Sequence, residues 1–305
     1  MTNQIVIAIA GVMCRGAGGG MHPGWSLLYK NIILPLRKEG KHVFVCGFNN
    51  IPETIDNCTT PIDGGRSYFR LHHYECWRQS DIDACEAGRM YRELVESKKL
   101  RHPIHERENL ARVLFVEGRA IQYIREQIQK KIFSSDIRVV LVTPDLCLFG
   151  GELHQSVINC PPGALTVLAR KPAKPGEENW VENGFITGSA KDIFSWRKEL
   201  LRANVPCSDI GNGCYEMWWH ESLIPFTVHG ARLHAETSGS KWWSMHNTGR
   251  TFRGYSSPKD YISSDKFPWK SHKEKNRIQE FLKHHKEFVI ELAYATKLAA
   301  TLPRK

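Results

Sequence analysis

Short hydrophobic runs alternate with amphipathic segments along the first half of the chain. Residues 5–10, 42–47 and 137–143 are almost continuously apolar, which is typical of strands that are buried on both faces. Between them, residues 25–36 and 104–133 carry apolar side chains every three or four positions, which predicts amphipathic helices. Strands that alternate with helices predict parallel connections and an α/β fold.

The pattern is less regular after residue 145. Short strands are predicted at 165–168 and 184–186, and Ser189 is placed to cap the helix that follows. Residues 238–269 are rich in Gly, Ser, Trp, Arg and Lys without a clear period, which predicts long loops. The other predicted helices span 75–97, either unbroken or divided at 80–81, and 216–226 and 275–298.

These elements predict a Rossmann-like sheet flanked by helices. We expect residues 1–235 to form the binding and catalytic region. Residues 236–305 are expected to form a loop-rich, basic and aromatic segment with a closing helix, packed on the same domain. No run approaches the roughly 20 apolar residues of a membrane span, so we expect a soluble, cytoplasmic protein without a secretory signal.

Charge and cysteine content narrow the function classes. A net charge of +10 favours an anionic partner, which includes nucleic acid, a membrane surface and a phosphorylated small molecule. The nine cysteines are an odd number without a Cys-x-x-Cys pair, which argues against a complete disulfide framework and against a zinc ribbon. The histidines form no His-Glu-x-x-His motif, which argues against a zinc site of that kind.

A glycine-rich turn, residues 11–20, lies between the first strand and the first helix. Glycines such as Gly11 allow close approach of the backbone to phosphate, and Arg15 is suited to bidentate pairing with a diphosphate. The turn has neither the Gly-x-Gly-x-x-Gly spacing nor the Gly-Lys-Ser/Thr of a Walker loop. The turn can therefore be interpreted either as a nucleotide-binding loop or as a plain connecting loop.

Asp145 follows the apolar run that ends at Thr143. Ligands of open α/β sheets bind outside the carboxyl ends of the strands, where a carboxylate can hold a divalent cation beside the phosphates of a nucleotide. The alternative is a turn-forming aspartate after Pro144. Asp81 and Asp83 form the single Asp-x-Asp of the chain and are the rival metal site, although a helix amino terminus explains them more simply.

Two aromatic segments are candidates for ligand contact. Residues 216–221 carry Trp218, Trp219 and the carboxylate of Glu221, which fits either sugar stacking beside a catalytic base or an ordinary packed helix. Residues 241–253 are basic and aromatic, which suits nucleic acid, a carbohydrate acceptor or a donor phosphate. No helix-turn-helix, zinc-finger or ribonucleoprotein motif supports the nucleic-acid interpretation.

Four segments together resemble a known family in the right order, namely residues 9–15, 31–36, 143–146 and 184–192. The family is that of the GT-A-type glycosyltransferases of large algal viruses and their microbial relatives. The resemblance covers most of residues 1–225 and implies a GT-A central sheet, a nucleoside diphosphate sugar as donor and a Mn²⁺ or Mg²⁺ ion. It also implies a viral protein that acts in the host cytoplasm on glycan biosynthesis.

The resemblance implies roles for Arg15 and Asp145, and the sequence pattern adds further candidates. Gly11, Arg15 and Lys191 would contact the donor, and Asp145 would stand at the acidic motif, where it would contact the donor and hold the metal. Asp192 and Glu221 are the expected catalytic residues. The expected activity is transfer of a sugar to a glycan or glycoprotein acceptor. The alternatives are a basic nucleic-acid-binding protein and another Rossmann-type transferase, such as a methyltransferase.

Overall fold

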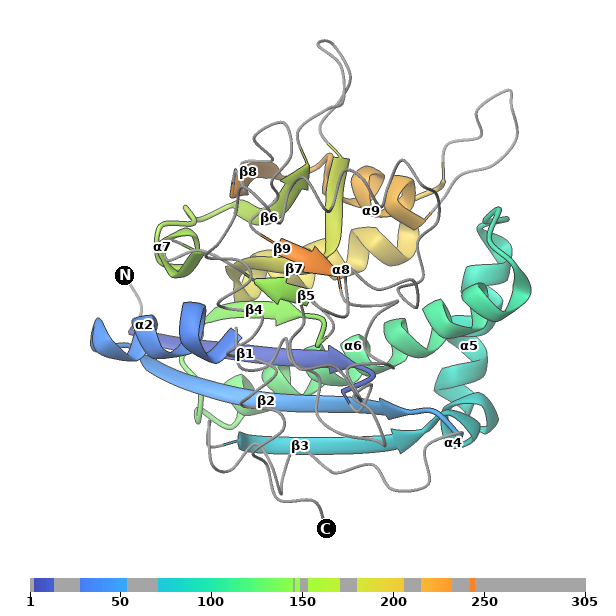
Figure 1. Cartoon of the computed structure of the whole chain (residues 1–305), viewed down its shortest axis with the longest axis horizontal. Coiled ribbons are helices and arrows are strands. Elements are labelled where there is room, and N and C mark those ends of the chain that lie inside the picture. Colours follow the sequence, from blue (N-terminus) through green and yellow to red (C-terminus); the bar gives the residue numbers. More distant parts are fainter. Residues whose placement is uncertain are drawn as a thin grey trace, which may run out of the picture.

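The computed structural model describes residues 3–13, 28–53, 71–144, 146–148, 153–170, 180–205, 215–231 and 242–244 (Figure 1). In the first half, the elements are β1 (Gln4–Gly11), the π-helix η2 (Tyr29–Ile33), α2 (Leu34–Lys38), β2 (His42–Ile51), β3 (Leu71–Arg78), α4 (Gln79–Ala84), α5 (Glu86–Ser97), α6 (Ile104–Gln129) and β4 (Arg138–Val142). They are followed by β5 (Leu146–Leu148), α7 (Leu153–Ile158), β6 (Ala164–Arg170), β7 (Trp180–Ser189), α8 (Ala190–Arg202), α9 (Tyr215–Leu223), β8 (Thr227–Ala231) and β9 (Trp242–Ser244).

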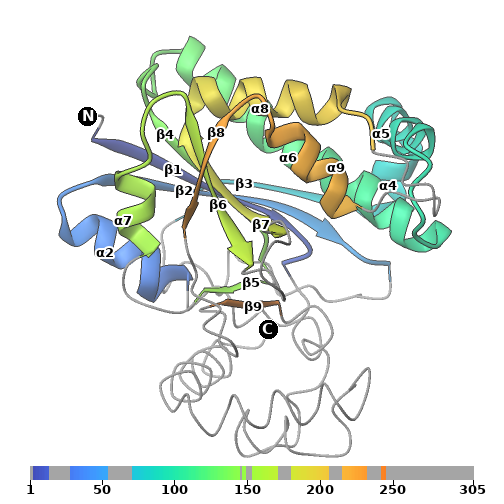
Figure 2. The ribbon, with the colours of Figure 1, turned by 90° about the horizontal axis from the view of Figure 1, so that it is seen from above.

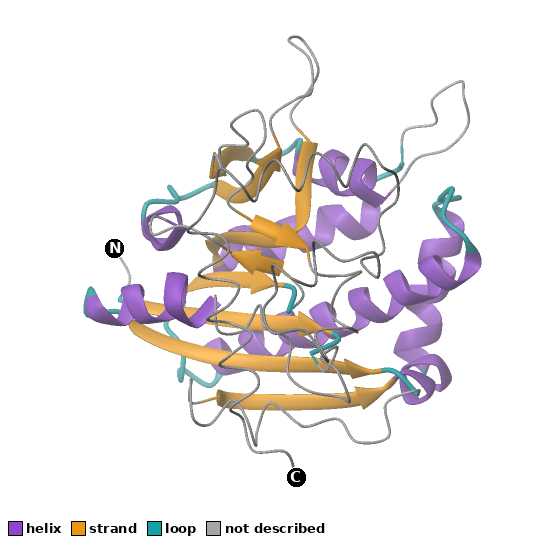
Figure 3. Cartoon of the chain, in the orientation of Figure 1, coloured by secondary structure: helices purple, strands orange, loops and turns teal. Residues whose placement is uncertain are grey.

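Within the described residues, one sheet of seven strands forms the centre of the molecule (Figure 3). Its order is β3-β2-β1-β4-β7-β6-β8. The first four strands are parallel, β7 runs antiparallel to both of its neighbours, and β6 pairs parallel with β8. The arrangement β3-β2-β1-β4 is the beginning of the Rossmann order. The predicted α/β class with a helix-flanked sheet is therefore confirmed.

The sheet separates two hydrophobic layers (Figure 2). One layer lies beneath α4, α5, α6, α8 and α9 and includes the fully buried Phe48, Leu114 and Trp196. The other lies beneath η2, α2 and α7 and includes Ile7 and Ile32. Successive residues of β1 and β4 point alternately into the two layers, which explains why their sequences are continuously apolar.

Three ion pairs fix the long helix α6 on its face of the sheet. Arg112 binds Asp83 of α4, with Nε 3.0 Å from Oδ1. Arg119 forms a two-point contact with Glu75 of β3, at 2.9 and 3.1 Å. In the interior, Arg197 of α8 donates to Glu117 at 2.9 Å. Bidentate Arg–carboxylate contacts add directional specificity, so these pairs set the position of α6 along its axis as well as its orientation.

The sequence prediction was wrong at residues 75–78, where a helix was expected and the structure has the end of β3. His73, Glu75 and Trp77 point toward α6, whereas Tyr74 reaches Asn49 on the other face, so the segment follows the two-residue period of a strand. The expected division of the helix is present, but it lies at Cys85. Strand β9 lies in a segment that was expected to be loop, and the helix predicted at 275–298 lies outside the described residues.

Glu75 should make folding sensitive to acid. Burial alone would raise the pKa of Glu75, but hydrogen bonds from His73 and Arg119 lower it from 4.5 to about 2. A carboxyl with a lowered folded-state pKa stabilises the protein above pH 4.5, and this stabilisation is lost as the pH falls through about 2. We therefore expect the difference in urea midpoint between wild type and Glu75→Gln to shrink between these pH values.

The exposed pair of Glu106 with His102 offers the control for this titration. Glu106→Gln should leave the urea midpoint nearly unchanged over the same range, because exposed ion pairs contribute about 0 to 1 kcal/mol. A difference between wild type and Glu75→Gln that stayed constant down to the lowest pH would contradict the assignment.

Candidate functional site

The carboxyl ends of β1 and β4 lie side by side in the middle of the sheet. From β1 the chain continues to β2 and β3 on one side, and it returns to β4 on the other side. The strand order thus reverses between β1 and β4, which is the position where open α/β sheets bind ligands. Gly11 ends β1, and Asp145 is the third residue after β4. The predicted glycine and acidic motifs therefore belong to adjacent strand ends.

Gly11 touches the turn that leads to Asp145. Its φ is +140°, which L side chains rarely adopt, and a Cβ atom there would lie 2.9 Å from Cδ of Pro144. A separation under 3.0 Å is a steric clash, so both the backbone angle and the proline require glycine at this position. The end of β1 and the turn after β4 are therefore in direct contact.

Asn49 holds the chain where it leaves β1. The fully buried Asn49 accepts a hydrogen bond from the backbone N–H of Met13 at 2.9 Å. Its Nδ2 donates to Oη of Tyr74 at 2.9 Å, and burial raises the pKa of this tyrosine, which keeps the hydroxyl protonated. This chain of contacts crosses β1, β2 and β3 and fixes the start of the glycine-rich loop.

Asn50 presents an unused acceptor at the same edge. It is buried near the carboxyl end of β2, and its Oδ1 has no hydrogen-bond partner among the residues that the structure describes. A buried amide oxygen without a partner is energetically unfavourable. In native proteins such an atom usually accepts a hydrogen bond from water or from a ligand. Sequence analysis missed Asn49 and Asn50 because the predicted strand ended at Gly47. Two adjacent amides directly after an apolar run were the available signal.

A small cavity lies behind the end of β4, between the sheet and helices α6 and α9. Its volume is about 10 Å³, and Glu117, Thr143, Gly184 and Trp219 are among its lining residues. Glu117 is buried with Arg197, and although that arginine favours the ionised carboxylate, burial raises the pKa of Glu117 above its ordinary value. A carboxyl with a perturbed pKa thus stands directly behind the strand ends.

Asp145 and Arg15 lie outside the described residues, and so do the other residues of the glycine-rich loop after Met13. The neighbours of Asp145 are nevertheless fixed. Thr143 donates its backbone N–H to the Gly184 carbonyl at 2.9 Å, and Leu146 donates to the Thr143 carbonyl at 3.4 Å. Among the residues that the structure describes, no three His, Cys, Asp or Glu side chains gather as a metal site.

Lys191 and Asp192 do not lie at this edge. Ser189 pairs with Arg138 at the beginning of β4, because β7 runs antiparallel, so helix α8 begins at the opposite edge of the sheet. Ser189 Oγ accepts from the Asp192 backbone N–H at 3.1 Å, and the Asp192 carboxylate accepts from the Ser189 hydroxyl and from the Gly163 backbone. This corrects the expectation that Lys191 and Asp192 act together with Gly11, and it confirms the predicted Ser189 cap.

The tryptophans beside Glu221 are core residues. Trp218 donates to the Leu200 carbonyl at 2.6 Å, and Trp219 donates to Oη of Tyr215 at 2.9 Å, with both rings buried. The packed-helix interpretation is therefore correct for these two rings, and they cannot serve as a sugar platform. Glu221 is half-buried on α9 and is not among the residues that line the cavity behind β4.

The rival acidic motif is engaged in ion pairs. Asp83 binds Arg112 and also Arg92, the latter at 3.1 Å. Burial alone would raise the pKa of Asp83, but the contacts with these two arginines lower it. Asp81 lies in the first turn of α4, while Arg78 occupies the cap position. The ion pairs of Asp83 and the position of Asp81 in the first helical turn therefore support a structural role for both carboxylates, not a metal site.

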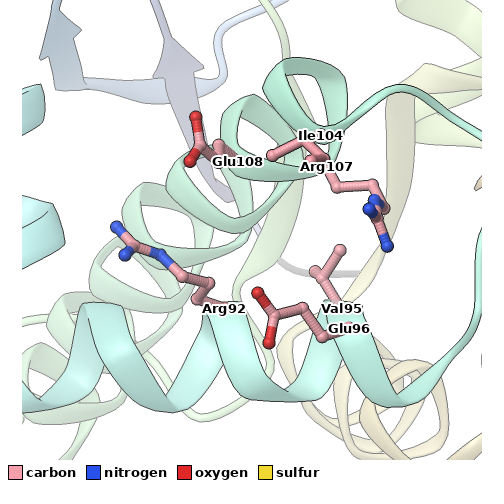
Figure 4. A pocket seen from close by; sticks show the side chains of 6 residues that line it. All are labelled: Arg92, Val95, Glu96, Ile104, Arg107 and Glu108. Atoms are coloured by element: carbon pink, nitrogen blue, oxygen red, sulfur yellow. The ribbon is translucent and has the colours of Figure 1, made fainter.

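A larger cavity of about 330 Å³ lies between α5 and α6 (Figure 4). Both helices contribute charged side chains of each sign to it, and the lining residues are Arg92, Val95, Glu96, Ile104, Arg107 and Glu108. It shares no lining residue with the cavity behind β4. We treat the ends of β1 and β4 as the candidate site, because the strand order reverses there.

Comparisons with known proteins do not assign the chain to a family. No family model matches it, and no curated protein matches it. Among solved structures, mouse xyloside xylosyltransferase 1 in its apo form is similar, with a TM-score of 0.41 and 11% identity over 74% of this chain and 84% of that one. None of the helices in the described part of the chain is both long and apolar enough to cross a bilayer.

Proposed function

We propose that this protein is a glycosyltransferase that moves a sugar from a nucleoside diphosphate sugar to a glycan or glycoprotein acceptor. The contact between Gly11 and Pro144 carries the proposal, because it joins a glycine-rich loop and an acid-bearing turn at the point where the strand order reverses. Glycine lets phosphate approach the backbone there. The net charge of +10 suits an anionic donor.

The proposed chemistry divides between binding the donor and stabilising the leaving group. An acceptor hydroxyl attacks the anomeric carbon, and the bond from that carbon to the diphosphate oxygen breaks. Arg15, four residues beyond Gly11 in the sequence, is proposed to neutralise the departing diphosphate. Asp145 is proposed to contact the donor, and with Mn²⁺ or Mg²⁺ it would supply one carboxylate ligand, while the remaining ligands come from donor phosphates and water.

Asn50 is proposed to complete the donor site. In nucleotide-binding α/β folds, a polar residue at the end of the second strand contacts the ribose. The buried Oδ1 of Asn50, which has no partner within the described part of the chain, is an acceptor at this position, and a ribose hydroxyl or a base N–H would satisfy it. Glu221 remains our proposal for the base that takes the acceptor proton.

Replacing Asp145 should separate donor recognition from folding. We expect Asp145→Ala to reduce sugar transfer by roughly 100-fold or more, because an electrostatic contact to the leaving group is lost, while the melting temperature without ligand stays close to wild type. Asp145→Asn is the matched variant, since it keeps the shape and removes only the charge. The assay is product formation by mass spectrometry with the UDP- or GDP-sugar that stabilises the wild type most, with and without MnCl₂.

A thermal-shift panel of UDP- and GDP-sugars tests the proposed class. Stabilisation of the wild type by UDP- or GDP-sugars, and its loss in Asp145→Ala, is the expected result. Stabilisation by S-adenosylmethionine alone would indicate a methyltransferase. Affinity for single-stranded RNA that falls steeply with salt, without a response to nucleotide sugars, would indicate a nucleic-acid-binding protein. A fully active Asp145→Ala variant would contradict the assigned role of this residue.

A further inference from the structure

An asparagine lies within an apolar helical segment on the face of η2, α2 and α7. Asn31 belongs to the π-helix η2 and is followed by the fully buried Ile32 and Ile33. Its own side chain is 5% exposed. Burying an amide among apolar side chains is unfavourable unless it is hydrogen-bonded, so the partner of Asn31 indicates its role.

That partner lies on the segment that follows β4. Nδ2 of Asn31 donates to the carbonyl oxygen of Leu148 at 2.7 Å, across 117 residues of sequence. Leu148 is the last residue of β5, which pairs antiparallel with β9. The bond therefore joins the helical segment that follows the glycine-rich loop to the segment that follows the acid-bearing turn.

Residues 143–148 are held at both ends. The Thr143 backbone donates to Gly184 of β7 at one end, and Leu148 accepts from Asn31 at the other end. The side chains of Leu146 and Leu148 are buried in the layer that also contains Ile32 and Ile33. Asp145 lies between these two anchors in the sequence. The chain on either side of Asp145 is therefore anchored to the rest of the molecule.

The helix around Asn31 has an unusual geometry. Leu34 donates its backbone N–H to the Tyr29 carbonyl, five residues earlier, which widens this turn relative to an α-helix. Single π-turns are rare and occur frequently at functional sites. Because one residue corresponds to about 100° of helical rotation, an extra residue in the turn changes which side chains face β5.

We infer that Asn31 is a positioning residue of the donor site, which holds the end of the acid-bearing segment 143–148 against η2. The inference rests on the proposed function for the chemical role of Asp145. Asn31 does not contact the reacting atoms in this scheme. Asn31 acts through the Leu148 carbonyl. Loss of this hydrogen bond should therefore lower kcat more than it weakens donor binding.

Asn31→Leu tests the inference, because leucine has the same branched shape without the hydrogen-bond donor. In ligand-free protein, we expect amide exchange across 143–148 to become about tenfold faster, which corresponds to the loss of one buried hydrogen bond. With the UDP- or GDP-sugar that stabilises the wild type most, we expect kcat to fall roughly 10- to 100-fold and the donor KM to change much less.

Ile33→Val is the matched control, since it removes one buried methylene group from the same helix and keeps the Asn31 bond. It should leave both the exchange of 143–148 and kcat close to wild type. If Asn31→Leu fails to fold, Asn31→Ala provides the same comparison without the added apolar bulk, and hydrogen exchange monitored by mass spectrometry reads its effect directly.

Unchanged exchange across 143–148 in the Asn31 variants would overturn the inference. Faster exchange together with wild-type kcat would overturn it as well, because the bond would then be structural only. Failure of the proposed function has a different signature: no UDP- or GDP-sugar would stabilise even the wild type, whereas the exchange measurement in ligand-free protein would still report whether Asn31 holds the segment.

Discussion

Gly11→Ala is expected to abolish donor binding and to reduce kcat/KM by roughly 100-fold or more. The added methyl group would lie 2.9 Å from Pro144, and the φ of +140° is unfavourable for alanine. Relief of this clash requires the loop after β1 and the turn before Asp145 to move apart. The strain should also lower stability by about 1 to 3 kcal/mol. Thermal shift with the UDP- or GDP-sugar panel measures the first effect, and urea unfolding measures the second.

Gly40→Ala separates the two causes. Gly40 also has a positive φ, of +74°, but a Cβ atom there has nothing within 4 Å. It lies two residues before the amino end of β2, at the edge opposite the candidate site. This variant should lose stability through its backbone angle and keep its response to the donor. A Gly11→Ala protein that binds nucleotide sugars as wild type does would remove the main support for the proposed site.

Glu117→Leu is expected to lower the free energy of unfolding by about 3 to 5 kcal/mol, because it leaves a buried arginine without its counter-charge. Arg197 donates to Glu117 at 2.9 Å and also to the Leu114 carbonyl at 2.5 Å, with little exposure to water. The double variant Glu117→Leu/Arg197→Met should recover most of this loss, since a buried ion pair is often no more stabilising than apolar residues of similar volume.

A double-mutant cycle gives the coupling energy of this pair. It compares the urea unfolding of the wild type, Glu117→Leu, Arg197→Met and the double variant. The exposed pair of Glu199 and Arg202, 3.9 Å apart, is the control, and Glu199→Ala should change stability by no more than about 1 kcal/mol. Additive losses in the double variant would show that Glu117 and Arg197 are not energetically coupled.

Much of the fold could be predicted because buried strands have a distinctive composition. The sequences of β1, β2 and β4 are apolar on both faces of the sheet. The capping residue Ser189 correctly predicted the start of helix α8. Strand β3 was harder to predict. It lies at the edge of the sheet, where half-exposed polar and aromatic residues such as His73 and Glu75 give no continuous apolar signal.

The sequence predicted which strand ends form the candidate site better than it predicted which residues lie there. Gly11 and Asp145 were each expected directly after a buried strand, and the structure shows that these two parallel strands are neighbours and end at one edge of the sheet. The direction of β7 was not evident from its sequence, and that direction carries Lys191 and Asp192 to the opposite edge. Contacts such as Asn31 with Leu148 join residues far apart in the chain and leave no periodic signal.

The anchoring of α6 has a mechanical consequence. The helix has 26 residues, which corresponds to a length of roughly 39 Å, and its three ion pairs lead to α4, β3 and α8. Sliding it by one turn would break all three together, so α6 has no neighbouring register of similar energy. This side of the molecule should therefore act as a rigid support for the strands of the sheet.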